Sequence, residues 1–412
     1  MACKDALPRH PAAGARGETF VKSRKLSRTR RRAAILGAAA TSVVAGVALL
    51  PNWSAGAAVV DDPKVDARTK ATFQRLADAV FTDRTEALVD GKQDNRGKPL
   101  TDGFSGDVTL SSKQNRTEDA TLSSLDQRKE RLAKLGEKYS KGSTAVTLDA
   151  TNVKGRKAKV AVTETTTLTY EKVRGDEPKA TGFQAHHELT FTADRHGDWQ
   201  LTGIRDTDEG LAVNQTARPS VAPMVAATTT STTPSAPKAS TSYPGPANAK
   251  NLTAGGLDYK AMATYAKQYW SNYNTAYPDF NGQGAGGDCT NFVSQALKAG
   301  GWKHVPGYVY DYTRWFGNAD IQSHSFIGVN EWSWFAQNSQ RTTSLANVYQ
   351  MDVGDVLQVD FDKDGSKDHT MIVTSRSRGV PYLTYHSTNT YSRSVASIIA
   401  SYPTAAYYAY RT

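Results

Sequence analysis

Apolar and polar residues alternate along three segments in the first half of the chain, at 146–150, 158–170 and 183–201. Such a period of two is typical of strands that bury one face. Two earlier segments, 64–90 and 117–140, have the three- and four-residue spacing of helices. Helices followed by antiparallel strands predict a small α+β domain over residues 58–212. By analogy with nuclear-transport-factor-type folds, we expect its sheet to curve into a cone.

A change in composition separates this domain from the rest of the chain. Residues 216–242 are almost only Thr, Ser, Ala, Pro and Val, a composition that cannot bury a core. Five of the seven tryptophans lie beyond this stretch. We therefore expect a flexible linker at 213–253 and a second domain at 254–412.

The second domain alternates helical and strand patterns. Helical spacing over 259–273 is followed by a glycine-rich loop and a second amphipathic segment at 289–297, which Gly300 and Gly301 should end. Strand patterns follow at 354–359, 370–374 and 382–385. This order predicts a helix packed on an antiparallel sheet, again of the α+β class.

The start of the chain resembles an export signal. A basic run at 22–32 precedes an apolar stretch at 33–50 and the small residues of Ala55-Gly56-Ala57. These features predict a secretory signal peptide over 1–57 and a secreted, extracellular product, with cell-wall association as one possibility. The pair Arg31-Arg32 also permits twin-arginine export, and the alternative is an uncleaved membrane anchor.

Most of the positive net charge of the chain lies in this leader. The chain carries +10, but residues 1–57 hold ten basic and two acidic side chains and so account for +8. Only +2 remains for the mature protein, which argues against a nucleic-acid partner. After cleavage, we expect no membrane association.

The cysteine content points to chemistry. Of the two cysteines, Cys3 lies in the leader, so the mature protein keeps one, Cys289, and has no internal disulfide. Asp288 occupies a predicted N-cap position, which places Cys289 in the first turn of a helix. There the helix dipole favours a thiolate, and free backbone amides can stabilise an oxyanion.

A nucleophilic cysteine needs a base and a group that orients the base. His369 precedes the strand pattern at 370–374, and His386 follows the pattern at 382–385. Two histidines at the ends of neighbouring strands could converge on the start of one helix. This combination favours catalysis over a buried structural thiol.

The segment Gly286-Gly287-Asp288-Cys289-Thr290-Asn291-Phe292-Val293-Ser294-Gln295, followed by Gly354-Asp355 and Asp368-His369, closely resembles the bacterial "putative amidase domain" family. That family is related to papain-like cell-wall peptidases and CHAP amidases. The resemblance covers about 255–412. It implies a papain-like domain with Cys289 as nucleophile, His369 as general acid/base and His386 as the third member. Asn389 is the alternative third member, and Gln283 is a candidate for the oxyanion hole.

An acidic loop beside His369 has two interpretations. Asp360, Asp362, Asp364 and Asp368 match the first nine positions of a calcium-binding loop. Met371 occupies the twelfth position, where a bidentate Glu belongs, so we favour an Asp- and Gly-rich turn. We expect no metal and no cofactor.

Together these patterns predict a secreted cysteine amidase or peptidase that cleaves a peptide or amide substrate through a thioester. Cell-wall peptidoglycan peptides are a candidate substrate, suggested by export and by the family resemblance. The alternative is a non-catalytic extracellular protein that binds the cell wall or glycans through aromatic stacking. Rapid alkylation of Cys289 at pH 6 would favour the enzyme.

Overall fold

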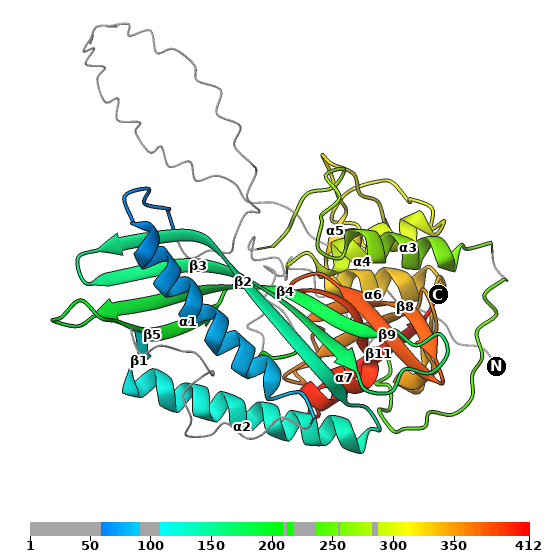
Figure 1. Cartoon of the computed structure of the whole chain (residues 1–412). Coiled ribbons are helices and arrows are strands. Elements are labelled where there is room, and N and C mark those ends of the chain that lie inside the picture. Colours follow the sequence, from blue (N-terminus) through cyan, green and yellow to red (C-terminus); the bar gives the residue numbers. More distant parts are fainter. Residues whose placement is uncertain (1–58, 91–107, 209–211, 217–235, 254–255, 282–286) are drawn as a thin grey trace, which may run out of the picture. The chain divides into compact units, whose positions relative to one another are not determined.

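The computed structural model describes residues 59–90, 108–208, 212–216, 236–253, 256–281 and 287–412 (Figure 1). These residues all belong to one compact unit, Leu50–Thr412. The expected leader at 1–57 lies outside them. Within the described ranges, no helix combines the length and the apolar character that crossing a bilayer requires.

The first half of the described chain is built of helices followed by long strands, as the sequence predicts. Its elements are α1 (Ala67–Glu86), β1 (Val108–Leu110), α2 (Ser112–Lys134), β2 (Tyr139–Lys154), β3 (Lys157–Tyr170), β4 (Ala180–Ala193) and β5 (Trp199–Asp206). Apolar residues of α1, Phe73 and Val80 among them, form one core with Val160 and Leu189 of the sheet. Strand β3 buries every second residue and β4 does so over much of its length, because successive side chains point to opposite faces.

The helix predicted at 117–140 is α2, which begins and ends several residues earlier. Ser111 is its N-cap, and the Ser111 side chain accepts a hydrogen bond from the Gln114 backbone. Gly136 follows the helix with a φ of 82°, a conformation that ends helices and that only glycine adopts at little cost. The chain then enters β2 at Tyr139.

The second half contains the remaining elements. They are α3 (Tyr259–Tyr269), α4 (Cys289–Ala299), α5 (His324–Ile327), α6 (Val329–Asn338), β6 (Thr343–Leu345), the 3₁₀ helix η1 (Val348–Gln350), β7 (Val356–Asp360), β8 (His369–Ser377), β9 (Val380–Tyr385), β10 (Asn389–Ser394), α7 (Val395–Ser401) and β11 (Ala406–Arg411). The helices at 259 and 289 and the three predicted strands are confirmed. Helix α3 is four residues shorter than the pattern 259–273 suggests.

One sheet joins the two halves. Strands β10, β9, β8, β7, β11 and β6 are hydrogen-bonded in that order, and β10 also pairs with β4 in antiparallel register. In that pairing Gly182 lies opposite Tyr391, and a Cβ atom on Gly182 would lie 2.6 Å from the Tyr391 ring. The sequence does not predict this pairing, since the paired residues of β4 and β10, such as Gly182 and Tyr391, are more than 200 positions apart.

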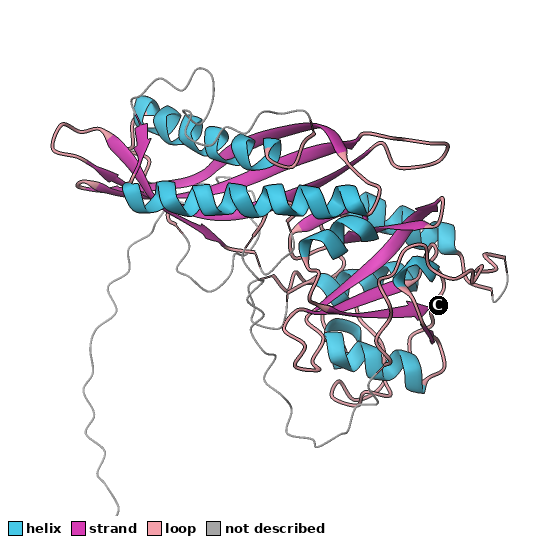
Figure 2. Cartoon of the chain, turned by 90° about the horizontal axis from the view of Figure 1, so that it is seen from below, coloured by secondary structure: helices cyan, strands magenta, loops and turns pink. Residues whose placement is uncertain are grey.

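Helices lie on both faces of the second-half sheet (Figure 2), and each face carries its own core. Helix α4 packs on the face that carries Val356 and Ile372. Met371 and Val373 belong to another core, together with Val395 and Ile398 of α7. The predicted α+β class and the helix packed on an antiparallel sheet are thus confirmed.

Both ends of the predicted linker are packed parts of the fold. On one side, Val213 and Asn214 are buried, and the Asn214 amide donates to Glu164 at 2.7 Å. On the other side, Ala236 and Ala239 are buried, and the Ala239 backbone donates to Tyr407 O at 2.7 Å. Residues 217–235 lie outside the described ranges, and the domain boundaries remain predictions.

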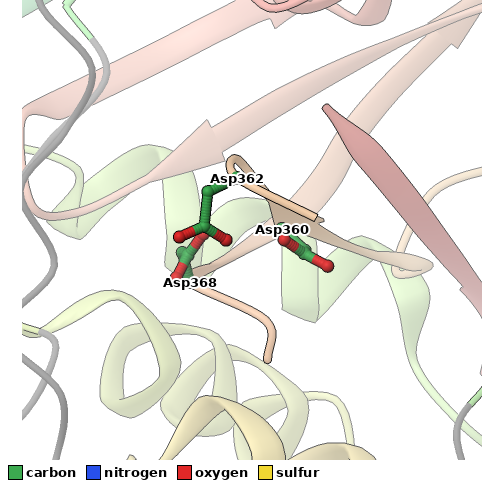
Figure 3. Close-up of side chains that lie close together, drawn as sticks. All are labelled: Asp360, Asp362 and Asp368. Atoms are coloured by element: carbon green, nitrogen blue, oxygen red, sulfur yellow. The ribbon is translucent and has the colours of Figure 1, made fainter. Parts of the chain in front are cut away.

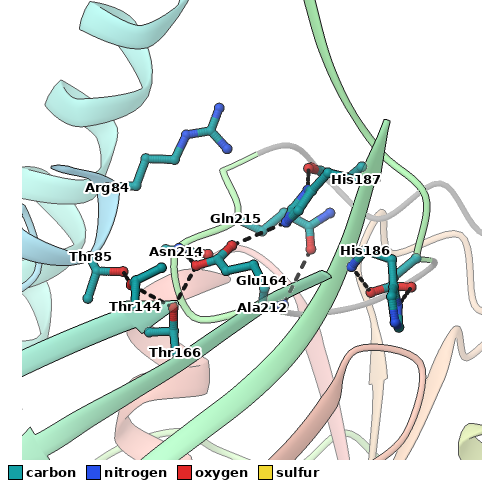
Figure 4. A network of polar contacts seen from close by, with 12 residues as sticks. Arg84, Thr85, Thr144, Glu164, Thr166, His186, His187, Ala212, Asn214 and Gln215 are labelled. Atoms are coloured by element: carbon teal, nitrogen blue, oxygen red, sulfur yellow. Dashed lines mark hydrogen bonds and ion pairs between the residues drawn. The ribbon is translucent and has the colours of Figure 1, made fainter. Parts of the chain in front are cut away.

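A buried polar network lies between α1 and the sheet of the first half (Figure 4). Glu164 is fully buried and accepts hydrogen bonds from Thr166, Asn214 and His187. The other ring nitrogen of His187 lies 2.9 Å from Asp206. Burial alone would lower the pKa of His187, but its hydrogen bonds to Asp206 and Glu164 outweigh burial and raise the pKa to about 9.

Candidate active site at the start of helix α4

Cys289 is the first residue of α4, as the sequence predicts, and it is 1% exposed. The chain enters the helix through Gly287, whose φ of 75° is a conformation that glycine adopts readily. The helix is anchored by the Phe292 backbone, which donates to Asp288 O at 2.9 Å. Cys289 therefore lies in the turn whose backbone N–H groups have no partners within the helix.

Asp288 occupies the N-cap position, but its carboxylate makes no capping hydrogen bond. Instead, Oδ2 lies 2.6 Å from Nδ1 of His386, and both side chains are buried. The other oxygen, Oδ1, accepts a hydrogen bond from the side-chain amide of Asn291 at 2.7 Å and one from the backbone N–H of Phe280 at 3.2 Å. The predicted cap is therefore wrong in its bonding, because His386 and Asn291 use the carboxylate that would otherwise bond the helix backbone.

The His386 ring is held on every side. Tyr273 and Phe292 stack on it, each with a ring-centroid distance of 3.9 Å. Its Nε2 lies 2.7 Å from Tyr269 O, the carbonyl at the end of α3. A carbonyl can only accept, so a hydrogen bond to Tyr269 O requires a proton on Nε2, while Nδ1 faces the Asp288 carboxylate.

His369 lies on the opposite face of the sheet from α4. On β8, Thr370 faces α4 and bonds Thr290 at 2.8 Å between hydroxyls. Because side chains alternate along a strand, His369 points the other way, and its ring meets the Tyr385 ring edge-on at 5.2 Å. The structure therefore does not bring His369 to the face where Cys289 begins its helix.

The surroundings of His369 are those of an uncharged core residue. Burial, together with the positive charge of Arg393, lowers the pKa of His369 to about 3. Its Nε2 is buried without a hydrogen-bond partner among the described residues. A general acid must hold a proton near neutral pH, which this environment opposes.

The contacts of His386 also differ from the predicted ones. Both ring nitrogens of His386 are bonded to Asp288 and Tyr269, so neither orients His369. Asn389, the alternative third member, accepts from the Tyr273 hydroxyl at 2.8 Å and so supports the ring that stacks on His386. Gln283 lies outside the described residues. The site thus gathers Cys289, Asp288, His386 and Asn389 at one end of α4, without His369.

The acidic loop forms a turn in this structure (Figure 3). Asp360 accepts from the backbones of Lys363 and Gly365, and Asp368 accepts from that of Phe361. Carboxylate oxygens of Asp360, Asp362 and Asp368 lie within 4.8 Å of one another, and Asp364 is not part of this group. The hydrogen bonds are those of the polar turn that the sequence favours.

Two features of the site escaped the sequence analysis. The Asp288–His386 pair was missed because an Asp before a helix has a sufficient explanation as a cap. Tyr273 is the last residue of the helical spacing over 259–273, whereas in the structure it lies beyond α3 and its ring stacks on His386. The signal for Phe292 was present, since Cys289 and Phe292 share one helical face.

Comparison with known proteins supports an amidase domain in the second half. Residues 256–410 match the model of the family described as "putative amidase domain". Two proteins of Bacillus subtilis (strain 168) are similar to part of this chain. "Uncharacterized protein YhbB" is 30% identical over 125 residues, which are 30% of this chain and 38% of that protein. "Uncharacterized protein YjcM" is 30% identical over 148 residues, 35% of each chain. This chain therefore spans little more than a third of either relative.

One solved structure was matched by fold. It is the "Crystal structure of intermembrane space region of chloroplast protein ARC6", with a TM-score of 0.23 and 15% identity. The match covers 35% of this chain and 98% of that one. It is the family match at residues 256–410, and not this structure, that suggests amide hydrolysis for the second half.

Proposed function

We propose that the chain is a cysteine amidase that cleaves amide bonds at the start of α4, with Cys289 as the nucleophile. The observation that carries this proposal is the placement of Cys289. It stands at the first position of a helix in an amidase-like region, between two residues that contact His386, namely Asp288 and Phe292.

In the proposed reaction, the Cys289 thiolate attacks the amide carbonyl carbon and forms a tetrahedral intermediate. Backbone N–H groups of the first turn of α4 stabilise its oxyanion. The C–N bond then breaks, the amine leaves with a proton, and the acyl group stays on sulfur as a thioester. Water then hydrolyses the thioester, which releases the carboxylic acid, returns a proton to the histidine and restores the thiolate.

We assign the proton transfer to His386 rather than to His369. His386 shares the face of α4, and Asp288 holds its Nδ1 as an orienting carboxylate would. Its Nε2 proton becomes available when the bond to Tyr269 O is exchanged for the substrate amine. Catalytic hydrogen bonds commonly form only in the substrate complex, so the free-state contact is compatible with this role.

A broader proposal concerns location and substrate. The basic and apolar leader at 1–57 supports export, and an exported amidase of bacterial family resemblance would meet cell-wall peptides. The test is to incubate the protein with purified peptidoglycan fragments and to search by mass spectrometry for a new amine. Cys289→Ala should abolish the product. If a Cys289→Ala sample yields the same amine, the cysteine amidase proposal is wrong; if the unmodified protein cleaves no fragment, the cell-wall substrate is wrong.

Matched substitutions of the two histidines by glutamine distinguish which of them transfers the proton. His386→Gln should lose nearly all turnover, whereas His369→Gln should keep turnover comparable to the unmodified protein when both are compared per folded molecule. The opposite order would return the acid/base role to His369. Circular dichroism of each variant supplies the folded fraction.

A further inference from the structure

A cavity of about 300 Å³ lies where the end of α2, the end of β3 and the β8–β9 turn meet. It lies apart from the residues that surround Cys289, since none of them lines it. Its volume is at the lower end of the range for small-molecule sites. Nothing in the amidase proposal uses this cavity.

The inner wall combines aromatic rings with one carboxyl group. Tyr170 and Tyr382 are each 5% exposed, and their rings meet edge-on at 5.8 Å. Glu137 lines the cavity beside them, and its Oε1 accepts from the Ser394 hydroxyl at 2.7 Å. Among the described residues, Glu137 forms no ion pair.

The carboxyl of Glu137 is therefore an acceptor without an ion-pair partner among the described residues. Burial raises the pKa of Glu137 to about 7, although the Ser394 hydroxyl and the charge of Arg393 act in the opposite direction. An ammonium group in the cavity would supply the missing positive charge. Tyrosine rings beside it favour the same kind of group through their negative faces.

The mouth of the cavity carries charges of both signs with basic groups in excess, since Glu171 and Glu177 line it together with Lys138, Lys172, Arg174 and Arg378. Arg174 and Arg378 line it, both exposed, and neither forms an ion pair with the described part of the chain. Lys138 also lines the cavity, but it is paired with Asp90 at 2.8 Å. Two unpaired guanidinium groups suit a carboxylate, which they can bind with two parallel hydrogen bonds.

A carboxyl inside and guanidinium groups outside match a ligand with the reverse order of charges. We propose that this cavity binds a zwitterionic amino acid or short peptide, with its ammonium group at Glu137 and its carboxylate at Arg174 and Arg378. The proposal does not depend on catalysis by Cys289. Such ligands are also what amide hydrolysis of a peptide releases.

The test is calorimetric titration of the full chain carrying Cys289→Ala, which cannot turn a peptide over. The probes are L-alanine, L-alanyl-L-alanine, and two analogues with one charge each, propylamine and propionate. One or both zwitterions should bind, and each analogue should bind roughly tenfold more weakly or worse. The two zwitterions distinguish an amino-acid site from a peptide site.

Variants then assign the site. Glu137→Gln should weaken zwitterion binding by roughly tenfold or more, because a charge-assisted hydrogen bond becomes a neutral one. Glu130→Gln, the same change at an exposed position of α2, should leave it unchanged. Arg378→Ala should weaken the zwitterion but not propylamine. Equal affinities of the Glu137→Gln and Glu130→Gln proteins, or no binding of either zwitterion in the millimolar range, would overturn the proposal.

Discussion

The Asp288–His386 pair should be one of the most stabilising contacts in the second half, and a double-mutant cycle can measure it. Both side chains are almost fully buried, and their nearest atoms are 2.6 Å apart. Removing one partner of a buried pair costs about 3–5 kcal/mol, because the other charge stays buried without compensation. Asn291 and Phe280 still donate to Asp288 in a His386→Ala protein, which favours the lower end of that range.

Two further losses add to this cost in His386→Ala. Stacking on Tyr273 and Phe292 disappears, at about 0.5–1.5 kcal/mol for each aromatic pair. The carbonyl of Tyr269 also loses its donor. We therefore expect the free energy of unfolding to fall by about 4 kcal/mol in His386→Ala and by about 3 kcal/mol in Asp288→Ala.

Urea denaturation at pH 7 measures both values by linear extrapolation. The Asp288→Ala/His386→Ala protein should lose less than the sum of the single changes, by about 2 kcal/mol, since each change removes the same pair. His196→Ala, at an exposed turn, is the matched control and should stay within about 0.5 kcal/mol of the unmodified protein. Strictly additive single changes would show that the two residues do not interact, and a loss below 1 kcal/mol in His386→Ala would refute the burial argument.

Three other predictions test the rest of the structure. His187 has a raised pKa of about 9, so its stabilising charge is fully present below its unfolded value of about 6.5 and is lost as pH rises through 9. The unfolding free energy should thus fall by about 3 kcal/mol between pH 6.5 and 9.5, and His187→Gln should flatten that slope. Limited proteolysis should cut first within 217–235, and the two fragments should still elute together from a sizing column, because β4 pairs with β10. Separate elution would contradict the shared sheet. Asp360→Asn should lower thermal stability, whereas a chelator should change neither stability nor turnover; restoration by calcium alone would instead establish a metal site.

Local patterns predicted the elements well because they depend on residues near in sequence. The alternation at 158–170 became β3, and the apolar face that begins at Cys289 became α4. The orientation of His369 was not predictable in the same way. A strand pattern states which residues share a face, but not which face a distant helix will cover. The Thr290–Thr370 hydrogen bond decides that question, and it joins residues 80 positions apart.

The pairing of β10 with β4 links the first half of the chain to the proposed active site. Asn389 lies opposite Gln184 of β4, and its side chain accepts from Tyr273, whose ring stacks on His386. Tyr391, two residues further along β10, fits against β4 because Gly182 has no side chain there. The ring centroids of Tyr391 and Trp270 are 4.6 Å apart. The loop that carries His386 therefore leads into β10, and β4 of the first half is hydrogen-bonded to the far side of β10. This arrangement gives that half a physical role in the proposed chemistry, because β10 would otherwise be an edge strand with unpaired backbone groups.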